Sequence, residues 1–167
     1  MSNQKFELLL EDTITVFGTK LFRIRAKTSF GEVNAGDIGG YVEKESNLSA
    51  HGISWVYGNA RVSGDAQVYG DAQVSGNARV SGNARVSGDA QVCNINAIFW
   101  ASRVGSENGT LTVCRTANGL RVSRGCFSGT DAQFLAAVDK RHGRDSRIGR
   151  EYHMLIKVAR SRILGTE

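Results

Sequence analysis

Small apolar residues recur every six positions through the middle of the chain, where residues 69–92 read YGDAQVSGNARVSGNARVSGDAQV. Val recurs at this spacing over 56–92, Ala over 60–90 and Gly over 58–88. The segment Ala-Arg/Gln-Val-Ser alternates apolar and polar residues, which predicts a strand of about four residues with one buried face. The Gly-Asn/Asp pair that follows is typical of a tight corner, because both residue types tolerate positive φ. We therefore expect one strand and one corner per unit, coiled around an axis with Val and Ala inside.

Such a unit cannot bury its Val alone, whereas stacked coils can, at roughly 1.5–3 kcal/mol for each fully buried Val. An α-helix is excluded, since a Gly every six residues would cost about 1 kcal/mol each and this period does not fit 3.6. The pattern predicts a solenoid over residues 56–92. Its outward Arg positions form a ladder that is a candidate binding surface, although any solenoid in water needs polar residues there. These positions are Arg61, Arg79 and Arg85.

The segments before the repeat predict a cap. TITVFG and KLFRIRA read as two strands joined by a turn at Gly18, and they would protect the open N-terminal edge of the solenoid. GDIGGYVEKESNLSAHGISWVYGNA reads as one or two degenerate coils, with a loop bulging out at 49–53. The chain then divides into an N-terminal cap with a degenerate coil (1–50), a hexapeptide solenoid (51–96) and a basic C-terminal β/α domain (97–167).

After residue 96, AIFWASRV, GTLTVCRT and LRVSRGCF alternate apolar and polar residues, which predicts an antiparallel sheet of two or three strands. Asn118-Gly119 is a strong hairpin signal. Thr130-Asp-Ala-Gln133 is a capping box that opens a helix ending near residue 142, with Gly143 as its stop. A second helix is expected over about 147–163. Trp55 and Trp100 flank the regular array and are expected to pack against the caps.

The units VSGNAR and VSGDAQ resemble those of the hexapeptide-repeat proteins that form left-handed parallel β-helices. In that family three hexads make one triangular coil, so residues 18 apart stack. The resemblance implies that Arg61 stacks with Arg79, Gln67 with Arg85, and Asp71 with Asp89. The expected fold is mainly β: a short left-handed parallel β-helix with an N-terminal strand cap and a C-terminal small sheet plus two α-helices.

The order of parts also resembles phage and prophage hexapeptide-repeat proteins. The shared features are the GDIGGYVEKESNLS entry, the GNARV/GDAQV array and a tail with GCFSGT, HG and EY, here Gly125–Thr130, His142-Gly143 and Glu151-Tyr152. This resemblance implies a phage or prophage origin, and it carries no assigned activity.

The composition limits which kinds of functional site the chain is expected to carry. The chain contains no Pro. Its three cysteines, Cys93, Cys114 and Cys126, show no CxxC spacing, so neither a zinc site nor a disulfide is expected. We expect the cysteines to be small core residues of a protein in a reducing cytoplasm. Neither a signal peptide nor a membrane span is visible, so no membrane partner is expected. No metal or cofactor is expected either.

Positive charge is concentrated in the C-terminal part. Residues 1–96 hold nine Lys/Arg against ten Asp/Glu, whereas residues 97–167 hold twelve against six. Such a cluster could neutralise phosphates, while the interleaved Asp139, Asp145 and Glu151 fit an ordinary solvated or protein-binding face. The candidate contact residues for nucleic acid or another partner are Arg121, Arg124, Lys140, Arg141, Arg144, Arg147, Arg150, Lys157 and Arg160.

Catalytic signals are weak. Many proteins of the left-handed β-helix family that the repeat resembles are trimeric acyltransferases with a His general base at a subunit boundary. That resemblance implies such a role for His51, in the 49–53 loop, if a neighbouring subunit closed over it. Cys126 with His142 or His153 could form a nucleophile and base, but nothing in their spacing places them together, and Cys126 falls in a strand pattern. Gly105–Gly109 reads as a hairpin loop rather than a phosphate cradle.

The sequence therefore favours a non-enzymatic, phage-encoded binding protein that engages a host or phage macromolecule in the bacterial cytoplasm. The favoured partner is a protein, and an inhibitor of a bacterial defence system, such as an anti-CRISPR, is one form of this function. Nucleic acid is the second candidate partner. The alternatives are an acyltransferase-like β-helix enzyme and a structural protein that self-assembles as a dimer, trimer or polymer.

Overall fold

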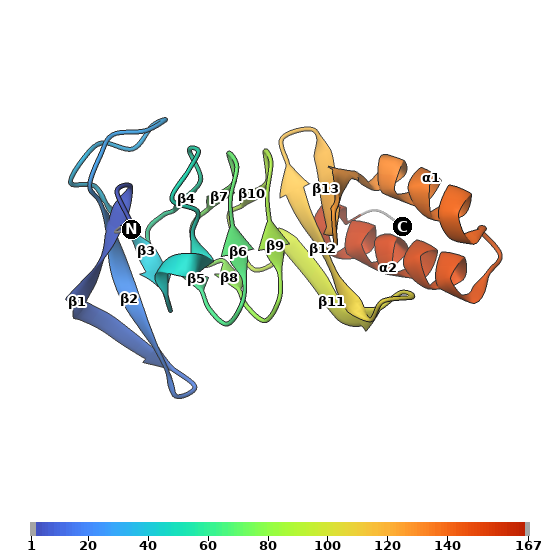
Figure 1. Cartoon of the computed structure of the whole chain (residues 1–167), viewed down its shortest axis with the longest axis horizontal. Coiled ribbons are helices and arrows are strands. Elements are labelled where there is room, and N and C mark those ends of the chain that lie inside the picture. The colour runs from blue at the N-terminus through green and yellow to red at the C-terminus, as the bar shows by residue number, and fades with distance from the viewer. Residues whose placement is uncertain (1–2, 166–167) are drawn as a thin grey trace.

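The six-residue repeat folds as a stack of short parallel strands in the middle of an elongated molecule (Figure 1). The computed structural model describes residues 3–165. Each repeat unit contributes one two-residue strand. The strands are β4 (Trp55–Val56), β5 (Arg61–Val62), β6 (Gln67–Val68), β7 (Gln73–Val74), β8 (Arg79–Val80), β9 (Arg85–Val86) and β10 (Gln91–Val92).

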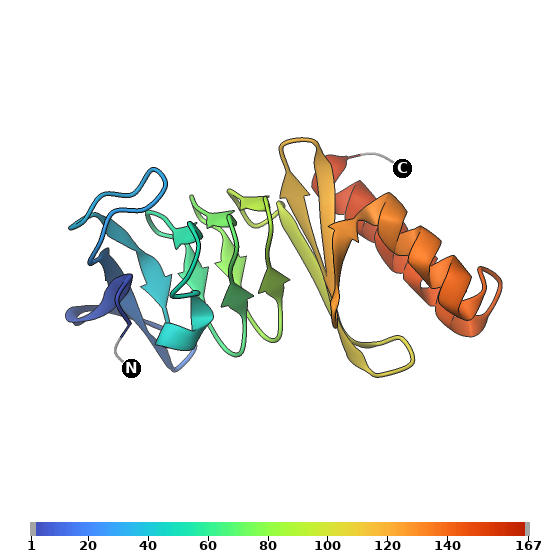
Figure 2. The ribbon, with the colours of Figure 1, turned by 45° about the horizontal axis from the view of Figure 1, so that its top comes forward.

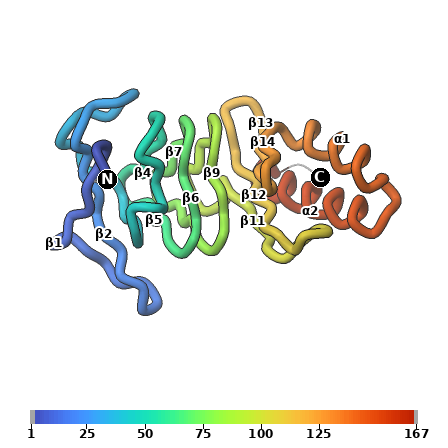
Figure 3. The backbone as a smooth tube through the Cα atoms, viewed as in Figure 1, coloured from blue at the N-terminus to red at the C-terminus, as the bar shows by residue number. Residues whose placement is uncertain are grey.

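Strands that are three units apart pair in parallel, so the stack has three columns. They are β5 with β8, β4 with β7 and β10, and β6 with β9. Arg61 lies opposite Arg79, and Gln67 lies opposite Arg85. The expected 18-residue register is confirmed by these pairs, and Asp71 follows it through a hydrogen bond from its amide to the Gly88 carbonyl (3.1 Å). The tube in Figure 3 shows the coils following one another along the long axis.

The repeating Ala and Val side chains fill the interior, with at most 1% of any of them exposed over residues 56–92. The expectation of four-residue strands is wrong, because most of the repeating Ala residues use their amide to close the corner before them. The Ala60 amide, for example, donates to the Tyr57 carbonyl (3.2 Å) rather than to the next coil. Each strand therefore shortens to the Arg/Gln-Val pair, although Ala carbonyls and Ser or Tyr amides also form hydrogen bonds between coils. The corner glycines from Gly58 to Gly88 have φ between 58° and 71°, a region that strains other residues.

A hairpin extends one column of the solenoid at its N-terminal end. The strands β1 (Phe6–Val16), β2 (Thr19–Ala26) and β3 (Ile38–Val42) join β5 and β8 in the order β1-β2-β3-β5-β8. The pairs β1–β2 and β2–β3 are antiparallel, and β3–β5 is parallel, as in the solenoid. The two expected N-terminal strands and the Gly18 turn are thus confirmed.

The degenerate coil before the regular repeat stacks with a 20-residue offset rather than 18. Val42 lies opposite Val62, and Leu48 forms a parallel bridge with Val68. The extra residues are accommodated at 49–53, where residues 50–53 are exposed, which confirms the expected loop.

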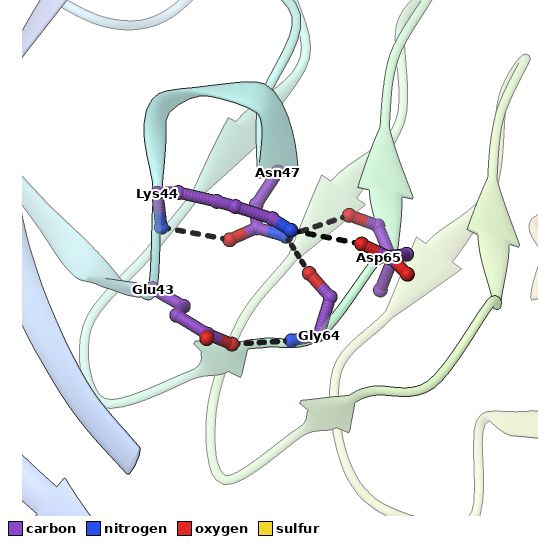
Figure 4. A network of polar contacts seen from close by, with 6 residues as sticks. Glu43, Lys44, Asn47, Gly64 and Asp65 are labelled. Atoms are coloured by element: carbon purple, nitrogen blue, oxygen red, sulfur yellow. Dashed lines mark hydrogen bonds and ion pairs between the residues drawn. The ribbon is translucent and has the colours of Figure 1, made fainter.

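A side-chain network replaces backbone pairing where the short 3₁₀ helix η1 (Glu45–Asn47) interrupts this coil (Figure 4). The buried Asn47 amide donates to the carbonyls of Gly64 (3.0 Å) and Ala66 (2.8 Å). Glu43 accepts from the Gly64 amide at 2.6 Å, and Lys44 pairs with Asp65 at 2.8 Å. The Asn47 side chain thus supplies the donor that a regular strand would supply from its backbone.

Lys5 and Trp55 close the N-terminal end. The Lys5 ammonium donates to the carbonyls of Ser54 (2.6 Å) and Ser49 (3.1 Å) and lies over the Phe30 ring. Trp55 is 1% exposed and packs edge-on against Phe6 and Phe30. Burial lowers the pKa of Lys5 to about 8.

A four-stranded antiparallel sheet and two helices form the other end of the molecule. The strands are β11 (Ile98–Val104), β12 (Gly109–Thr116), β13 (Gly119–Arg124) and β14 (Phe127–Thr130), and the helices are α1 (Asp131–His142) and α2 (Arg147–Leu164). The expectation of two or three strands is corrected to four, because the chain turns at Gly125-Cys126 and its last strand pairs back onto β13. The Thr130 capping box and the Gly143 stop are confirmed.

The sheet separates the solenoid from the helices (Figures 1 and 2). Alternate residues of β12 face opposite sides of the sheet. Cys114 belongs to the solenoid core, whereas Leu111 and Val113 pack with the helices. The buried Thr112 hydroxyl accepts a bond from the Arg85 amide (3.0 Å), which has no further coil to pair with. Trp100 is partly buried against the solenoid core, so both tryptophans contact the caps as expected.

The cysteines are distributed differently from the expectation. Only Cys114 is buried, and burial raises its pKa to about 12. Cys93 and Cys126 are exposed. Cys126 lies in the turn between β13 and β14, so its placement in a strand was wrong.

Candidate functional site

Three adjoining hollows run from the side of the solenoid across its boundary with the C-terminal part, and we call them together the junction groove. The coil hollow, about 370 Å³, and the polar hollow, about 540 Å³, share Gln67 and Arg85. The polar hollow and the aromatic hollow, about 320 Å³, share Arg124 and Gly125. The groove thus brings together Arg85 of the solenoid ladder and two members of the C-terminal basic set, Arg124 and Arg141.

Arg85 reaches from β9 toward the C-terminal sheet. Its Nη1 donates to the Gly125 carbonyl at 3.3 Å, in the turn between β13 and β14. Its other guanidinium donors have no partner among residues 3–165, and no carboxylate lies within ion-pair distance of it there.

Arg124, the last residue of β13, is fixed by two hydrogen bonds. Its Nε donates to the Tyr152 hydroxyl (2.9 Å), and its Nη2 donates to the Val104 carbonyl (3.2 Å). A Cβ on Gly109 would come within 2.4 Å of its Nη1, so this glycine leaves room for the guanidinium. Within the described part of the chain Arg124 forms no ion pair, and Nη1 donates no hydrogen bond.

The aromatic hollow lies beside this guanidinium. Its apolar wall comes from Phe127 on β14, Phe134 on α1 and Tyr152 on α2, whose rings pack edge-on in sequence at 5.3 and 5.1 Å between centroids. Arg141 on α1 lies at its rim and pairs with Glu107 at 3.4 Å. The hollow therefore combines an apolar wall with positive charge.

The remaining members of the basic set are spread over the surface. Arg121 pairs with Asp89 of the solenoid, and Arg160 pairs with Asp131, both at 2.7 Å. Arg147 lies 3.8 Å from Glu151, and Arg150 donates to the Asp145 carbonyl. Lys140, Arg144 and Lys157 are exposed and form no ion pair with any described residue. Arg61 and Arg79 lie in the column of β5 and β8, away from Arg85 in the column of β6 and β9.

The outer face of α2 carries apolar residues that the helical pattern had not singled out. Met154 is 63% exposed and Val158 is 44% exposed, one turn apart. With Lys157, Ser161 and Arg162 they line a shallow hollow of about 490 Å³. This pair was not singled out from the sequence, although the spacing of Met154 and Val158 by one helical turn is visible there.

Some of the candidate catalytic residues line a hollow and others do not. His51 is exposed in the 49–53 loop and lines none of the hollows described above. Cys126 and His142 both line the aromatic hollow, although no hydrogen bond joins them. His153 instead contacts Asp139 at 2.7 Å. Among residues 3–165 no cluster of three or more His, Cys, Asp or Glu could hold a metal ion.

Comparisons with known proteins concern only the solenoid. Residues 56–70, 72–82 and 78–94 match the YdcK beta solenoid repeat family. No curated protein matches the chain. Neither helix in the described part is both long and apolar enough to cross a membrane. The repeat is therefore a β-solenoid repeat, and the match ends at residue 94, before the C-terminal sheet and the helices.

Proposed function

We propose that this chain is a non-enzymatic binding protein that engages a partner protein through the outer face of α2 and the neighbouring α1–α2 turn. The observation that carries the proposal is the exposed pair Met154 and Val158 beside Lys157 and Arg162. Large apolar side chains that remain exposed next to one another are typical of a protein-binding surface. The lysine and arginine at its edge favour a partner that presents apolar residues ringed by acids.

The same end of the molecule is less suited to a nucleic-acid backbone. Arg147 lies near Glu151, and Asp145 and Asp139 stand among the cations of the turn. Carboxylates repel phosphates, so a phosphate-binding tract would be expected to lack them. Apolar side chains at the centre of a contact with a polar rim, in contrast, are common in protein interfaces.

The proposal gives the solenoid the role of a rigid support. The six-residue period and the three columns in 18-residue register support its assignment as a left-handed parallel β-helix of the hexapeptide type. The phage resemblance of the whole chain supports a phage or prophage origin and action in the bacterial cytoplasm. An inhibitor that occupies a surface of a host defence protein is the form of this function that we favour.

The test is an affinity pull-down from bacterial lysate, with and without nuclease, followed by mass spectrometry. Besides the wild type, it uses a Met154→Asp/Val158→Asp variant. As matched control we choose Leu10→Asp, because Leu10 is 68% exposed on β1 at the other end of the molecule. We expect one dominant protein that survives nuclease, is lost with the double variant and is retained by the control.

Two outcomes would contradict the proposal. If recovery collapses with nuclease, the partner is a nucleic acid and the relevant residues are the unpaired cations Lys140, Arg144 and Lys157. If the same protein is recovered equally with the double variant, the outer face of α2 is not its binding surface.

A further inference from the structure

The polar hollow of the junction groove holds two arginines that converge from different parts of the fold. Arg85 comes from the last solenoid coil, and Arg124 comes from the end of β13. Nη1 of Arg85 bonds to the carbonyl of Gly125, and Nη1 of Arg124 lies against Gly109, so the two arginines line the same hollow. The hollow, at about 540 Å³, has the size of a small-molecule site.

Both guanidinium groups are oriented, yet neither is neutralised by a carboxylate within residues 3–165. Arg124 uses two of its five donors on Tyr152 and Val104, and Arg85 uses one on Gly125. Orienting bonds to neutral oxygens hold the planar forks in place without consuming their charge. A fixed fork of N–H donors matches the paired oxygens of a carboxylate or phosphate.

The acid in this hollow has its own partner. Asp65 contributes to the lining, but it forms a 2.8 Å ion pair with Lys44 (Figure 4). This hydrogen bond lowers the pKa of Asp65, so the carboxylate stays ionised and paired. The remaining lining side chains include the amides of Gln67, Asn83 and Asn108, which are neutral. The two arginines therefore give the hollow a net positive charge.

The adjoining aromatic hollow shares Arg124 and adds an apolar wall. Phe127, Phe134 and Tyr152 line it, with Arg141 at the rim. A ligand with its anionic group between Arg85 and Arg124 would thus find room for a ring or another apolar body on the other side of Arg124. The acid that lines this hollow, Glu107, is paired with Arg141.

From this arrangement we propose that the junction groove binds a small organic oxyanion, with its carboxylate or phosphate between Arg85 and Arg124 and its apolar ring in the aromatic hollow. The site is separate from the protein-binding face proposed above, since it uses none of the residues of the outer face of α2. Arg85 and Arg124 supply the charge, and Tyr152 positions Arg124.

The test titrates the full chain with phenyl phosphate, benzoate and phenol by isothermal titration calorimetry. The three probes share one ring and differ in the anionic group, so they separate a phosphate ligand from a carboxylate ligand. We expect one of the two anions to bind and phenol to bind at least tenfold more weakly. The affinity should fall as salt is raised, because exposed charges are screened.

Variants locate the site. Arg85→Gln and Arg124→Gln should each weaken the preferred anion by roughly 10- to 100-fold, the loss typical of a charge-assisted hydrogen bond. Arg79→Gln is the matched control, since Arg79 belongs to another column of the same solenoid. Gly109→Ala keeps every charge but crowds Nη1 of Arg124, so it should weaken binding in the same direction.

The proposal is overturned if neither anion binds at millimolar concentration, or if Arg79→Gln weakens binding as much as Arg124→Gln does. Binding of inorganic phosphate as tight as that of phenyl phosphate would remove the aromatic hollow from the site. Tyr152→Phe tests the positioning role: the chain should stay folded by circular dichroism, while the affinity falls between those of Arg124→Gln and the wild type.

Discussion

At the N-terminal end of the solenoid the chain continues the strand ladder outward, whereas at the C-terminal end a separate sheet packs against the last coil. The first end is completed by β3 pairing with β5 and by side chains such as Lys5 and Asn47 that reach the carbonyls of the adjoining coil. The second end is completed by hydroxyls, with Thr112 accepting from the Arg85 amide and Ser87 bonded to Ser123 at 3.0 Å.

This difference explains where hollows form. A ladder that continues from coil to coil repeats the same spacing and leaves little room between layers. A sheet with its own strand direction touches the last coil along some strands, while its turns at Gly105–Gly109 and Gly125-Cys126 overhang the edge. Residues of these turns line the polar and aromatic hollows of the junction groove. Binding sites in many proteins lie at such boundaries between structural units.

The largest effect should come from removing the aromatic anchor of the N-terminal end. Trp55→Ala deletes a side chain that is 1% exposed and packed between Phe6 and Phe30, so it should cost about 3–5 kcal/mol of unfolding free energy. Trp100→Ala, at the partly buried counterpart, should cost clearly less. Urea denaturation of both variants measures the difference, and equal losses would show that the two ends are packed alike.

Lys5→Met should be the next most damaging change. It leaves the carbonyls of Ser49 and Ser54 without their donor, at about 1–3 kcal/mol for a buried unpaired group, partly offset by removal of a buried charge. Lys20→Met, at an exposed position on β2, should stay within about 0.5 kcal/mol. A Lys5→Met variant as stable as Lys20→Met would mean that the N-terminal end does not need this donor.

The same lysine gives the N-terminal end a pH signature. Its folded pKa of about 8 lies below the usual value of 10.5, so between these pH values the unfolded chain binds the proton and the folded chain does not. Stability should therefore rise with pH across this window, because the cost of burying the charge disappears. The free-energy difference between wild type and Lys5→Met isolates this contribution, and a difference that falls from pH 8 to 10 would contradict the assignment.

At the C-terminal end, Thr112→Val should have a smaller effect, about 1–2 kcal/mol. The valine has nearly the same shape but cannot accept from the Arg85 amide, which then loses its partner at a partly buried position. Thr110→Val on the same strand is the control, because its hydroxyl bonds to Ser102 at the surface. Denaturant midpoints that shift equally for both variants would show that the hydroxyl at 112 does not complete the ladder.

The sequence predicted the regular parts of this fold well and the irregular parts poorly. The six-residue spacing of Val and Ala was sufficient to predict the buried residues, and the 18-residue register followed from the family resemblance. The two-residue strands were missed because the amides of most repeating Ala residues close a corner, which the alternation of apolar and polar residues does not reveal. The fourth strand of the C-terminal sheet was missed because Gly125-Cys126 was read as part of a strand.

The candidate site was harder to predict from the sequence than the fold. Counting charge identified Arg124 and Arg141 among nine candidates, and the outward ladder included Arg85. Nothing local to these residues shows that β9 and the end of β13 meet, since they are about forty residues apart in the chain. Equally, the sequence did not distinguish Arg121, held by Asp89, from Arg124, which forms no ion pair with any residue of 3–165.

The 18-residue register also makes the solenoid a spacer of adjustable length. Three hexads add one coil, so a tandem duplication of eighteen residues would move the C-terminal sheet and helices away from the N-terminal hairpin by ~4.8 Å, the ordinary separation of paired strands. Each column would gain one strand, and the packing at both ends would be unchanged. Nearly identical repeats invite such duplications through misaligned recombination. The reach of this molecule can thus evolve in fixed steps, independently of the surfaces that it carries.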